Sequence, residues 1–294
     1  MQEVVVISGK GGTGKTSVLS GLANFGPSKV LADCDVDAAD LHLVLHPSIQ
    51  QENEFISGEI ARIDADTCTE CGLCRQYCRF GAIDDSFRVW KQDCEGCALC
   101  LHVCPSGAVK MEARFNGYWY VSRTRFGTMV HAALLPGEEN SGKLVNIVRT
   151  EARQIAQDNA IDLILTDGSP GIGCPVIASL SRASLALIVA EPTLAAIGDL
   201  KRVQELTAYF RIPSGIVINK ADINETLSRE IDVFAREKGL PLLGRIPYSE
   251  AVTRAQIEGR SIVEHDPGGL GSILLRIWEE IRAKLEAEKQ APSA

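Results

Sequence analysis

The feature that most constrains the fold is a glycine-rich loop placed between an apolar strand and a helix at the amino terminus. Residues 4–8 read Val-Val-Val-Ile-Ser, the pattern of a buried strand. The loop that follows is Gly9-Lys10-Gly11-Gly12-Thr13-Gly14-Lys15-Thr16, and a helix is expected over 15–25. Glycines let backbone N–H groups converge on phosphate oxygens at a helix amino terminus, where the helix dipole favours anions. The chain is therefore expected to bind a phosphate-bearing ligand on an α/β fold.

Short apolar runs alternate with amphipathic helical stretches along most of the chain. Further strands are expected at 30–33, 163–166, 185–189, 215–218 and 242–244. A helix over 198–209 is indicated by apolar residues at helical spacing, and an exposed turn is expected at 138–142. This alternation predicts a parallel sheet covered by helices.

The loop and the strand ends supply the candidate nucleotide ligands. Lys15 is expected to reach the β- and γ-phosphates, and Thr16 to hold Mg²⁺. The loop residues expected to contact the nucleotide are Gly9, Lys10, Gly11, Gly12, Thr13, Gly14, Lys15, Thr16 and Ser17. Asp33, Asp35 and Asp167 stand at the carboxyl ends of strands, where lone aspartates are often helix caps. Three of them in a phosphate-loop fold favour a functional site instead.

The loop carries an additional lysine, Lys10, and its pattern Lys-Gly-Gly-x-Gly-Lys-Thr resembles the deviant phosphate-binding loop of the MinD/ParA family. That family includes the nitrogenase iron protein, and the resemblance extends over most of the chain outside a cysteine-rich segment. It implies a P-loop ATPase in which Lys10 reaches across a dimer to the nucleotide of the partner subunit. The dimer, formed on ATP binding, would be a homodimer or a paralogous heterodimer.

The same resemblance assigns roles to the aspartates. Asp33-Cys34-Asp35 resembles the first switch, in which Asp35 positions or deprotonates the attacking water and Asp33 supports the magnesium site. Asp167-Gly168-Ser169-Pro170-Gly171 resembles the second switch, in which Asp167 holds Mg²⁺ through water and Gly168 or Gly171 senses the γ-phosphate. The residues implied for catalysis are Lys10, Lys15, Asp35 and Asp167.

Base recognition leaves two nucleotides open. Asn219-Lys220-Ala221-Asp222 has the form that reads guanine in GTPases, because the aspartate accepts both guanine N–H groups. The MinD/ParA family places an asparagine at this point against adenine, and a loop such as 246–249, with Pro247, packs on the base. ATP is favoured over GTP, and hydrolysis is expected to be slow until a partner completes the site.

Eight of the ten cysteines form two matching runs. The first is Cys68, Cys71, Cys74 and Cys78; the second is Cys94, Cys97, Cys100 and Cys104, which Pro105 follows. This spacing is that of a bacterial-type ferredoxin with two 4Fe–4S clusters. Zinc also accepts Cys-x-x-Cys pairs, but three close cysteines and a remote fourth, given twice, fit cubane clusters better. We expect an inserted α+β ferredoxin domain at 58–113 and a discontinuous ATPase domain at 1–57 and 114–294.

In two-cluster ferredoxins the fourth cysteine of each run ligates the other cluster. One cluster is therefore expected on Cys68, Cys71, Cys74 and Cys104, and the other on Cys94, Cys97, Cys100 and Cys78. Arg79 stands where the other run has Pro105, and it is expected to alter the local backbone and the potential of that cluster.

Two cysteines lie outside the runs. Cys34, between two switch aspartates, is expected to be a buried packing residue. Cys174, on the second switch, is expected to pack near Pro175, with a dimer-bridging or metal-holding thiol as the alternative.

Composition limits the partners. A net charge of −8 argues against nucleic acid or anionic lipid. No segment reaches the roughly 18 apolar residues of a membrane span, and the charges of the carboxyl-terminal helix are balanced, so core packing is expected there and no stable membrane anchor. Cysteines in a chain without an export signal indicate metal ligands in a cytoplasmic protein.

These features favour a nucleotide-gated redox ATPase that changes its contact with an unknown redox or client protein. The alternatives are an ATPase that assembles or carries clusters or metal, and a MinD-like positioning ATPase whose clusters are structural.

Overall fold

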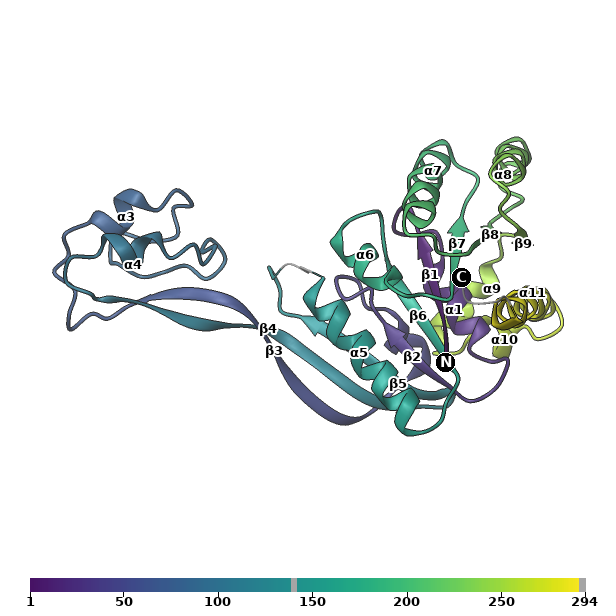
Figure 1. Ribbon diagram of the computed structural model, residues 1–294, viewed down its shortest axis with the longest axis horizontal. Coiled ribbons are helices and arrows are strands. Elements are labelled where there is room, and N and C mark those ends of the chain that lie inside the picture. The colour runs from purple at the N-terminus through teal and green to yellow at the C-terminus, as the bar shows by residue number, and fades with distance from the viewer. Residues whose placement is uncertain (139–141, 291–294) are drawn as a thin grey trace. The chain divides into compact units, whose positions relative to one another are not determined.

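The computed structural model describes residues 1–138 and 142–290. Its helices and strands are, in chain order, β1 Gln2–Ser8, α1 Lys15–Leu22, β2 Lys29–Asp33, α2 Leu41–Leu45, β3 Ser48–Ile63, α3 Leu73–Tyr77, α4 Leu99–Val103, β4 Val109–Thr124, β5 Gly127–Leu134, α5 Lys143–Asp158, β6 Leu163–Pro170, α6 Cys174–Leu180, β7 Leu185–Ala190, α7 Leu194–Tyr209, β8 Ser214–Asn219, α8 Glu225–Glu237, β9 Leu242–Ile246, α9 Glu250–Ile257, α10 Ile262–His265 and α11 Leu270–Gln290 (Figure 1). Most of the exposed turn expected at 138–142 lies outside the described residues.

The chain divides into two compact units. The first unit is Met1–Glu52, Trp119–Ala133 and Asn140–Ala294; the second is Asn53–Tyr118 with Leu134–Glu139. The second unit contains both cysteine runs. Strands β3 and β4 carry the chain from one unit into the other.

The sheet has the strand order β3-β4-β5-β2-β6-β1-β7-β8-β9. Every pairing from β5 to β9 is parallel, with β1 between β6 and β7. Because parallel strands end at the same edge, the loops after β1, β2, β6, β7 and β8 gather there. The predicted parallel-dominant α/β sheet is confirmed.

Alternate residues of β1 enter two different apolar cores. Val4 and Val6 pack on the side covered by α1 and α11, whereas Val5 and Ile7 pack on the side covered by α6, α7 and α8. This follows from the two-residue repeat of a strand, and burial on both faces explains the continuous apolar run. Leu274, Ile277, Trp278, Ile281 and Leu285 of α11 are all at most 5% exposed, so the expected core packing is confirmed for these residues, whereas Leu275 of the same helix is 42% exposed.

Two helix boundaries differ from expectation. The helix expected to reach residue 25 ends at Leu22, and Gly26 then adopts a left-handed backbone with φ 80° against the Trp278 ring. The helix expected from residue 198 begins at Leu194, because the Thr193 side chain accepts a hydrogen bond from the Ala196 N–H and caps it.

The two cysteine runs of the second unit have matching backbones. Short helices α3 and α4 each follow a left-handed residue, Gly72 with φ 77° and Ala98 with φ 60°. Cys78 has φ −75° and ψ 97°, and Cys104 has φ −80° and ψ 110°. The cysteines that precede Arg79 and Pro105 therefore have closely similar backbones, and no effect of Arg79 is seen on the backbone of Cys78.

We find no helix in 1–138 or 142–290 with the length and hydrophobicity that a membrane crossing requires.

Candidate nucleotide site and cysteine-lined cavity

The glycine-rich loop lies at the carboxyl edge of the sheet, directly after the central strand β1. Lys15, the first residue of α1, is only 5% exposed, and its Nζ lies 3.3 Å from Asp35 Oδ2. Thr16 Oγ1 donates a hydrogen bond to Asp167 Oδ2 at 2.6 Å. The structure thus brings the loop together with an aspartate after β2 and another on β6.

Two aspartate oxygens at this edge have no hydrogen-bond partner among the described residues, namely Asp33 Oδ2 and Asp167 Oδ1. Burial raises the pKa of Asp33 well above its ordinary value, and the charges of Asp167 and Asp35 raise it further. Burial likewise raises the pKa of Asp167 to about 7, although Lys15 and Thr16 oppose the shift. Buried carboxylates without donors are the ligands that Mg²⁺ accepts, so the residues present fit this ion.

Burial also raises the pKa of Asp35, against the opposing charge and hydrogen bond of Lys15. Asp35 is 7% exposed and lines the same pocket as the loop. A carboxylate with a raised pKa is a better proton acceptor, which suits a group placed beside an attacking water.

The pocket at this edge is lined by glycine-rich loop residues together with residues at the end of β8, in the loop after β9 and along α9. Its lining includes Gly11, Gly12, Gly14, Lys15, Thr16, Ser17, Asp35, Asn219, Lys220, Pro247, Tyr248, Val252, Thr253 and Gln256. The other candidate ligands, Gly9, Lys10, Thr13, Asp33, Asp167 and Asp222, lie outside this lining.

Sequence reasoning missed the contribution of α9. Gln256 Nε2 donates to Ser17 Oγ at 3.0 Å and closes one side of the pocket. The sequence offered one signal for this contribution: α9 begins directly after the loop at 246–249, which was expected to pack on the base.

Asn219 and Asp222, the two residues expected to read the base, form hydrogen bonds with backbone groups of this chain. Asn219 Nδ2 donates to the Thr13 carbonyl at 2.7 Å, and a Cβ on Gly14 would lie 2.3 Å from that nitrogen. This contact requires glycine at position 14. Asp222 Oδ1 accepts from the Tyr248 N–H at 2.6 Å, so this carboxylate holds the loop that follows β9.

Lys10 is held within its own subunit. Its Nζ lies 2.7 Å from Glu191 Oε1 and donates to Thr193 Oγ1 at 3.3 Å. Glu191 Oε2 lies 3.0 Å from the Nζ of a second lysine, Lys220. Sequence analysis did not single out Glu191, although an acidic residue directly after a buried strand was visible in the sequence.

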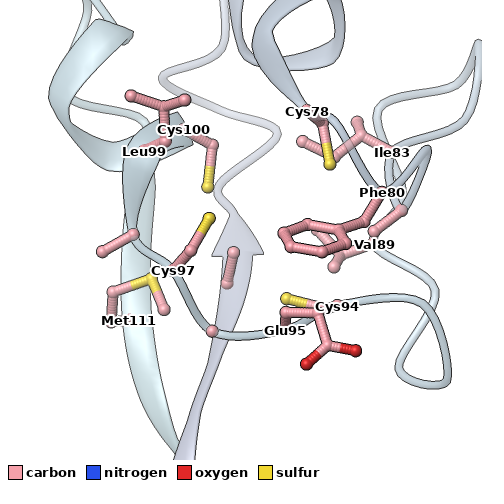
Figure 2. A pocket seen from close by; sticks show the side chains of 14 residues that line it. Cys78, Phe80, Ile83, Val89, Cys94, Glu95, Cys97, Leu99, Cys100 and Met111 are labelled. Carbon is pink, nitrogen blue, oxygen red and sulfur yellow. The ribbon is translucent and has the colours of Figure 1, made fainter.

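In the second unit, four cysteines line one cavity. Cys78, Cys94, Cys97 and Cys100 point their thiols toward a common space, and the Phe80 ring also points into it (Figure 2). The remaining lining is mostly apolar, including Ile83, Val89, Leu99 and Met111. Three of these cysteines come from the second run and one from the first.

The other four cysteines also lie near one another. Burial raises the pKa of the Cys74 thiol, and the proximity of Cys104, Cys68 and Cys71 raises it further. The Glu70 N–H donates to Cys68 Sγ at 3.4 Å, from a left-handed residue with φ 53°. Gly96 holds the matching place in the second run, with φ 64°.

Across 1–138 and 142–290, no three or more His, Cys, Asp or Glu side chains are grouped closely enough to hold a metal ion. Cys34 is fully buried, as expected. Cys174 is exposed at the first residue of α6, so the expectation that it packs beside Pro175 is wrong.

Comparison with known proteins identifies relatives in sequence and in fold. An uncharacterized protein of Methanocaldococcus jannaschii is 37% identical over 227 residues, covering 76% of this chain and 80% of the relative. A second uncharacterized protein of the same organism is 24% identical over 278 residues, covering 90% of this chain and 93% of the relative.

Two solved structures of MinD share the fold. The septum site-determining protein MinD of Pyrococcus horikoshii with Mg-ADP superposes with a TM-score of 0.60 at 18% identity, covering 99% of each chain. MinD in the MinC:MinD complex of Aquifex aeolicus gives 0.58 at 17% identity, covering 96% of each. The model of the CobQ/CobB/MinD/ParA nucleotide binding domain matches residues 4–262. The chain therefore belongs to the CobQ/CobB/MinD/ParA family of nucleotide-binding proteins.

Proposed function

We propose that this protein is a nucleotide-gated redox ATPase, in which ATP binding and hydrolysis control electron transfer through two 4Fe–4S clusters. The observation that carries the proposal is the cavity lined by Cys78, Cys94, Cys97 and Cys100, in a chain whose other unit holds a nucleotide site. The proposed cytoplasmic protein acts as a dimer, of identical or paralogous subunits, on an unidentified redox or client protein.

The chemistry of the cysteine sets supports a cubane. Each iron of a 4Fe–4S cluster takes one cysteine thiolate, so the ligands surround the cluster. A zinc ion instead needs its four ligands about 2.3 Å from a single point. One cluster would be held by Cys78, Cys94, Cys97 and Cys100, and the other by Cys68, Cys71, Cys74 and Cys104. When bound, the clusters supply one-electron transfer at low potential.

The backbone of the second unit supports the same assignment. In the first run the left-handed residue Glu70 turns its N–H toward Cys68 Sγ, and Gly96 has the same left-handed backbone in the second run. Such backbone concavities favour negatively charged sulfur, because an N–H that faces a thiolate stabilises its charge.

At the nucleotide site, the proposed work of the side chains follows from their contacts. A phosphate competes with Asp35 for Lys15, whose Nζ lies 3.3 Å from that carboxylate. Asp35, once released, is free to accept a proton from the attacking water. Thr16 and Asp167 are placed to bind Mg²⁺, with Asp33 in support.

We favour ATP over GTP because Asp222 is already engaged. Its Oδ1 accepts the Tyr248 N–H, whereas guanine recognition would require both carboxylate oxygens for the base. Asn219, Pro247 and Tyr248 remain on the pocket that would receive an adenine.

Coupling requires that the two nucleotide states differ in their interaction with the redox partner. Asp35 lies in the segment that leads through α2 into β3, and β3 continues into the second unit. Movement of this switch therefore acts on a strand at which the cysteine-rich unit is attached.

The composition of reconstituted protein tests the cluster assignment. Anaerobic reconstitution should give about eight irons and eight sulfides per chain, reducible in two one-electron steps, with ATP hydrolysis that is slow without a partner. Two zinc ions per chain without labile sulfide would contradict the proposal.

Two other functions have specific support. Fold likeness to MinD favours a positioning ATPase with structural clusters. The buried apolar face of α11, however, leaves no amphipathic membrane anchor on that helix.

Exposure of Cys71 and Cys97 favours a cluster carrier. Stoichiometric cluster transfer to an apo-acceptor would indicate the carrier, whereas clusters retained over many redox cycles would indicate the redox ATPase.

A further inference from the structure

Glu191 is a buried carboxylate shared by two lysines at the nucleotide edge of the sheet. The residue is 7% exposed and follows directly after β7. One oxygen pairs with Lys10 at 2.7 Å and the other with Lys220 at 3.0 Å. Burial alone would raise the pKa of Glu191, but its hydrogen bonds and ion pairs with the two lysines bring it below the usual value.

Strand order creates this arrangement. Strand β7 pairs in parallel with β1 on one side and with β8 on the other, with Ile188 opposite Ile7 and Ala190 opposite Ile218. The residues just past the three strand ends therefore meet at one edge. Lys10, Glu191 and Lys220 are those residues, although they are far apart in the sequence.

Lys220 and Lys10 differ in how they are attached. Lys220 Nζ also donates to the Gly12 carbonyl at 3.1 Å, so this lysine is fixed to the phosphate-binding loop. The two lysine side chains are similarly exposed, 33% for Lys10 and 31% for Lys220, but the other side-chain contact of Lys10 is the 3.3 Å hydrogen bond to Thr193, outside the loop. If Lys10 leaves, Glu191 keeps one cation, so no buried carboxylate is left without a partner.

We propose that Glu191 is a positioning residue for Lys10, holding it within its own subunit until Lys10 is released to the partner's nucleotide, while Lys220 stays to neutralise Glu191. This inference rests on the nucleotide-dependent dimer of the proposed function. The ion pair between Glu191 and Lys10 thereby sets how readily the dimer forms. Lys220 weakens this ion pair, because it shares the charge of Glu191.

The first test measures the release of Lys10 in the free subunit. Amine labelling of the cluster-loaded protein, without nucleotide, should modify Lys10 several-fold faster in Glu191→Gln than in wild type, with the exposed Lys201 as internal reference. The exposed Glu205→Gln on α7 removes the same charge and should leave Lys10 labelling unchanged. Equal Lys10 labelling in wild type and Glu191→Gln would overturn the inference.

The second test measures the dimer dissociation constant by analytical ultracentrifugation with a non-hydrolysable ATP analogue. A symmetric dimer releases two lysines, so a factor of about threefold for each partly exposed ion pair gives about tenfold tighter association for Glu191→Gln. A merely structural role of Glu191 predicts the opposite sign, because disturbing this edge would weaken the dimer.

Lys220→Met should change the dimer dissociation constant in the direction opposite to Glu191→Gln. Without Lys220, Glu191 depends on Lys10 alone, and the dimer should be about tenfold weaker. In the double variant Glu191→Gln/Lys220→Met this weakening should disappear; if it persists, Lys220 acts through Gly12 alone and the inference fails. If wild type dimerises and Glu191→Gln dimerises with the same dissociation constant, only the proposed role of Glu191 is overturned. Absence of association in every variant overturns the proposed dimer as well.

Discussion

The two units of the molecule differ in what fills their interiors. The first unit buries branched aliphatic side chains on both faces of a parallel sheet. The second unit has a small core in which Cys74 and Cys94 are buried beside Ala61, Ala82 and Ile83, with Cys78, Cys100 and Cys104 packed against it. Residues that should bind iron are therefore also core residues of the second unit, whereas in the first unit the site lies at the edge of a core that is complete without it.

In the first unit, ligand binding and folding should therefore be separable, whereas in the second unit folding should depend on cluster binding. A small domain with little apolar surface depends on a metal or a cross-link for stability. The first unit should thus tolerate changes in its site, and the second should not.

Removal of iron gives the largest expected effect. Chelation or oxidative loss of the clusters should unfold the second unit, since binding free energy of its ligands is part of its folding free energy. Hydrogen exchange should show lost protection over α3 and α4, while β1, β6 and β7 stay protected. Exchange that is unchanged in both units would break the comparison.

Single-ligand substitutions sharpen the comparison within the second unit. Cys71→Ser and Cys97→Ser each remove an exposed proposed ligand, one from each run. Because each should damage one cluster, iron content should fall to about half in either variant and the remaining cluster should stay reducible. Cys174→Ser, an exposed cysteine outside both runs, is the matched control and should keep full iron content.

Lys15→Ala tests whether the first unit can lose ligand binding and still keep its fold. Removing this charge should weaken ATP binding by about 100-fold, because charge-assisted hydrogen bonds to phosphate contribute roughly 1.5–3 kcal/mol each. Isothermal titration measures the affinity, and the iron content should stay near wild type, although the loss of the buried partner of Asp35 lowers the melting temperature. A collapse of the fold in Lys15→Ala would show that this site is not separable from its core.

Acid should give a smaller effect, to which His131 of the first unit contributes. Burial lowers the pKa of His131 from 6.5 to about 4, with Ser122 Oγ 2.9 Å from its Nε2. Between these values the unfolded chain binds a proton at His131 that the folded chain does not, so the contribution of His131 lowers stability, by at most about 3 kcal/mol, as pH drops from about 6.5 to about 4. The raised pKa values of Asp33, Asp35 and Asp167 contribute with the opposite sign as pH falls.

Denaturant titrations of the first unit at several pH values check this slope. The slope of His131→Asn should differ from that of wild type by the His131 contribution, whereas the exposed His102→Asn should keep the wild-type slope. An unchanged slope in His131→Asn would assign the acid sensitivity to other groups.

Local sequence patterns predicted most of the fold and the candidate site. The loop at 9–16 and the apolar runs defined a parallel sheet, and strand-end aspartates such as Asp33 and Asp167 followed from it. The pairing of Lys10 with Glu191 could not be predicted, because it depends on β7 lying between β1 and β8. Exposure of Cys174 also depends on tertiary structure, and the backbone of Cys78, before Arg79, matches that of Cys104, before Pro105.

The central claim is that nucleotide state controls the clusters, and the most direct measurement compares cluster reduction potentials and electron-transfer rates with ADP and with a non-hydrolysable ATP analogue. The account predicts a difference between the two states in potential or in rate; a shift of about 30 mV would correspond to about 0.7 kcal/mol for one electron. Lys15→Ala should abolish the difference. Identical potentials and identical rates in both nucleotide states would contradict the claim and leave the cysteine-rich unit as a structural element of an ordinary ATPase.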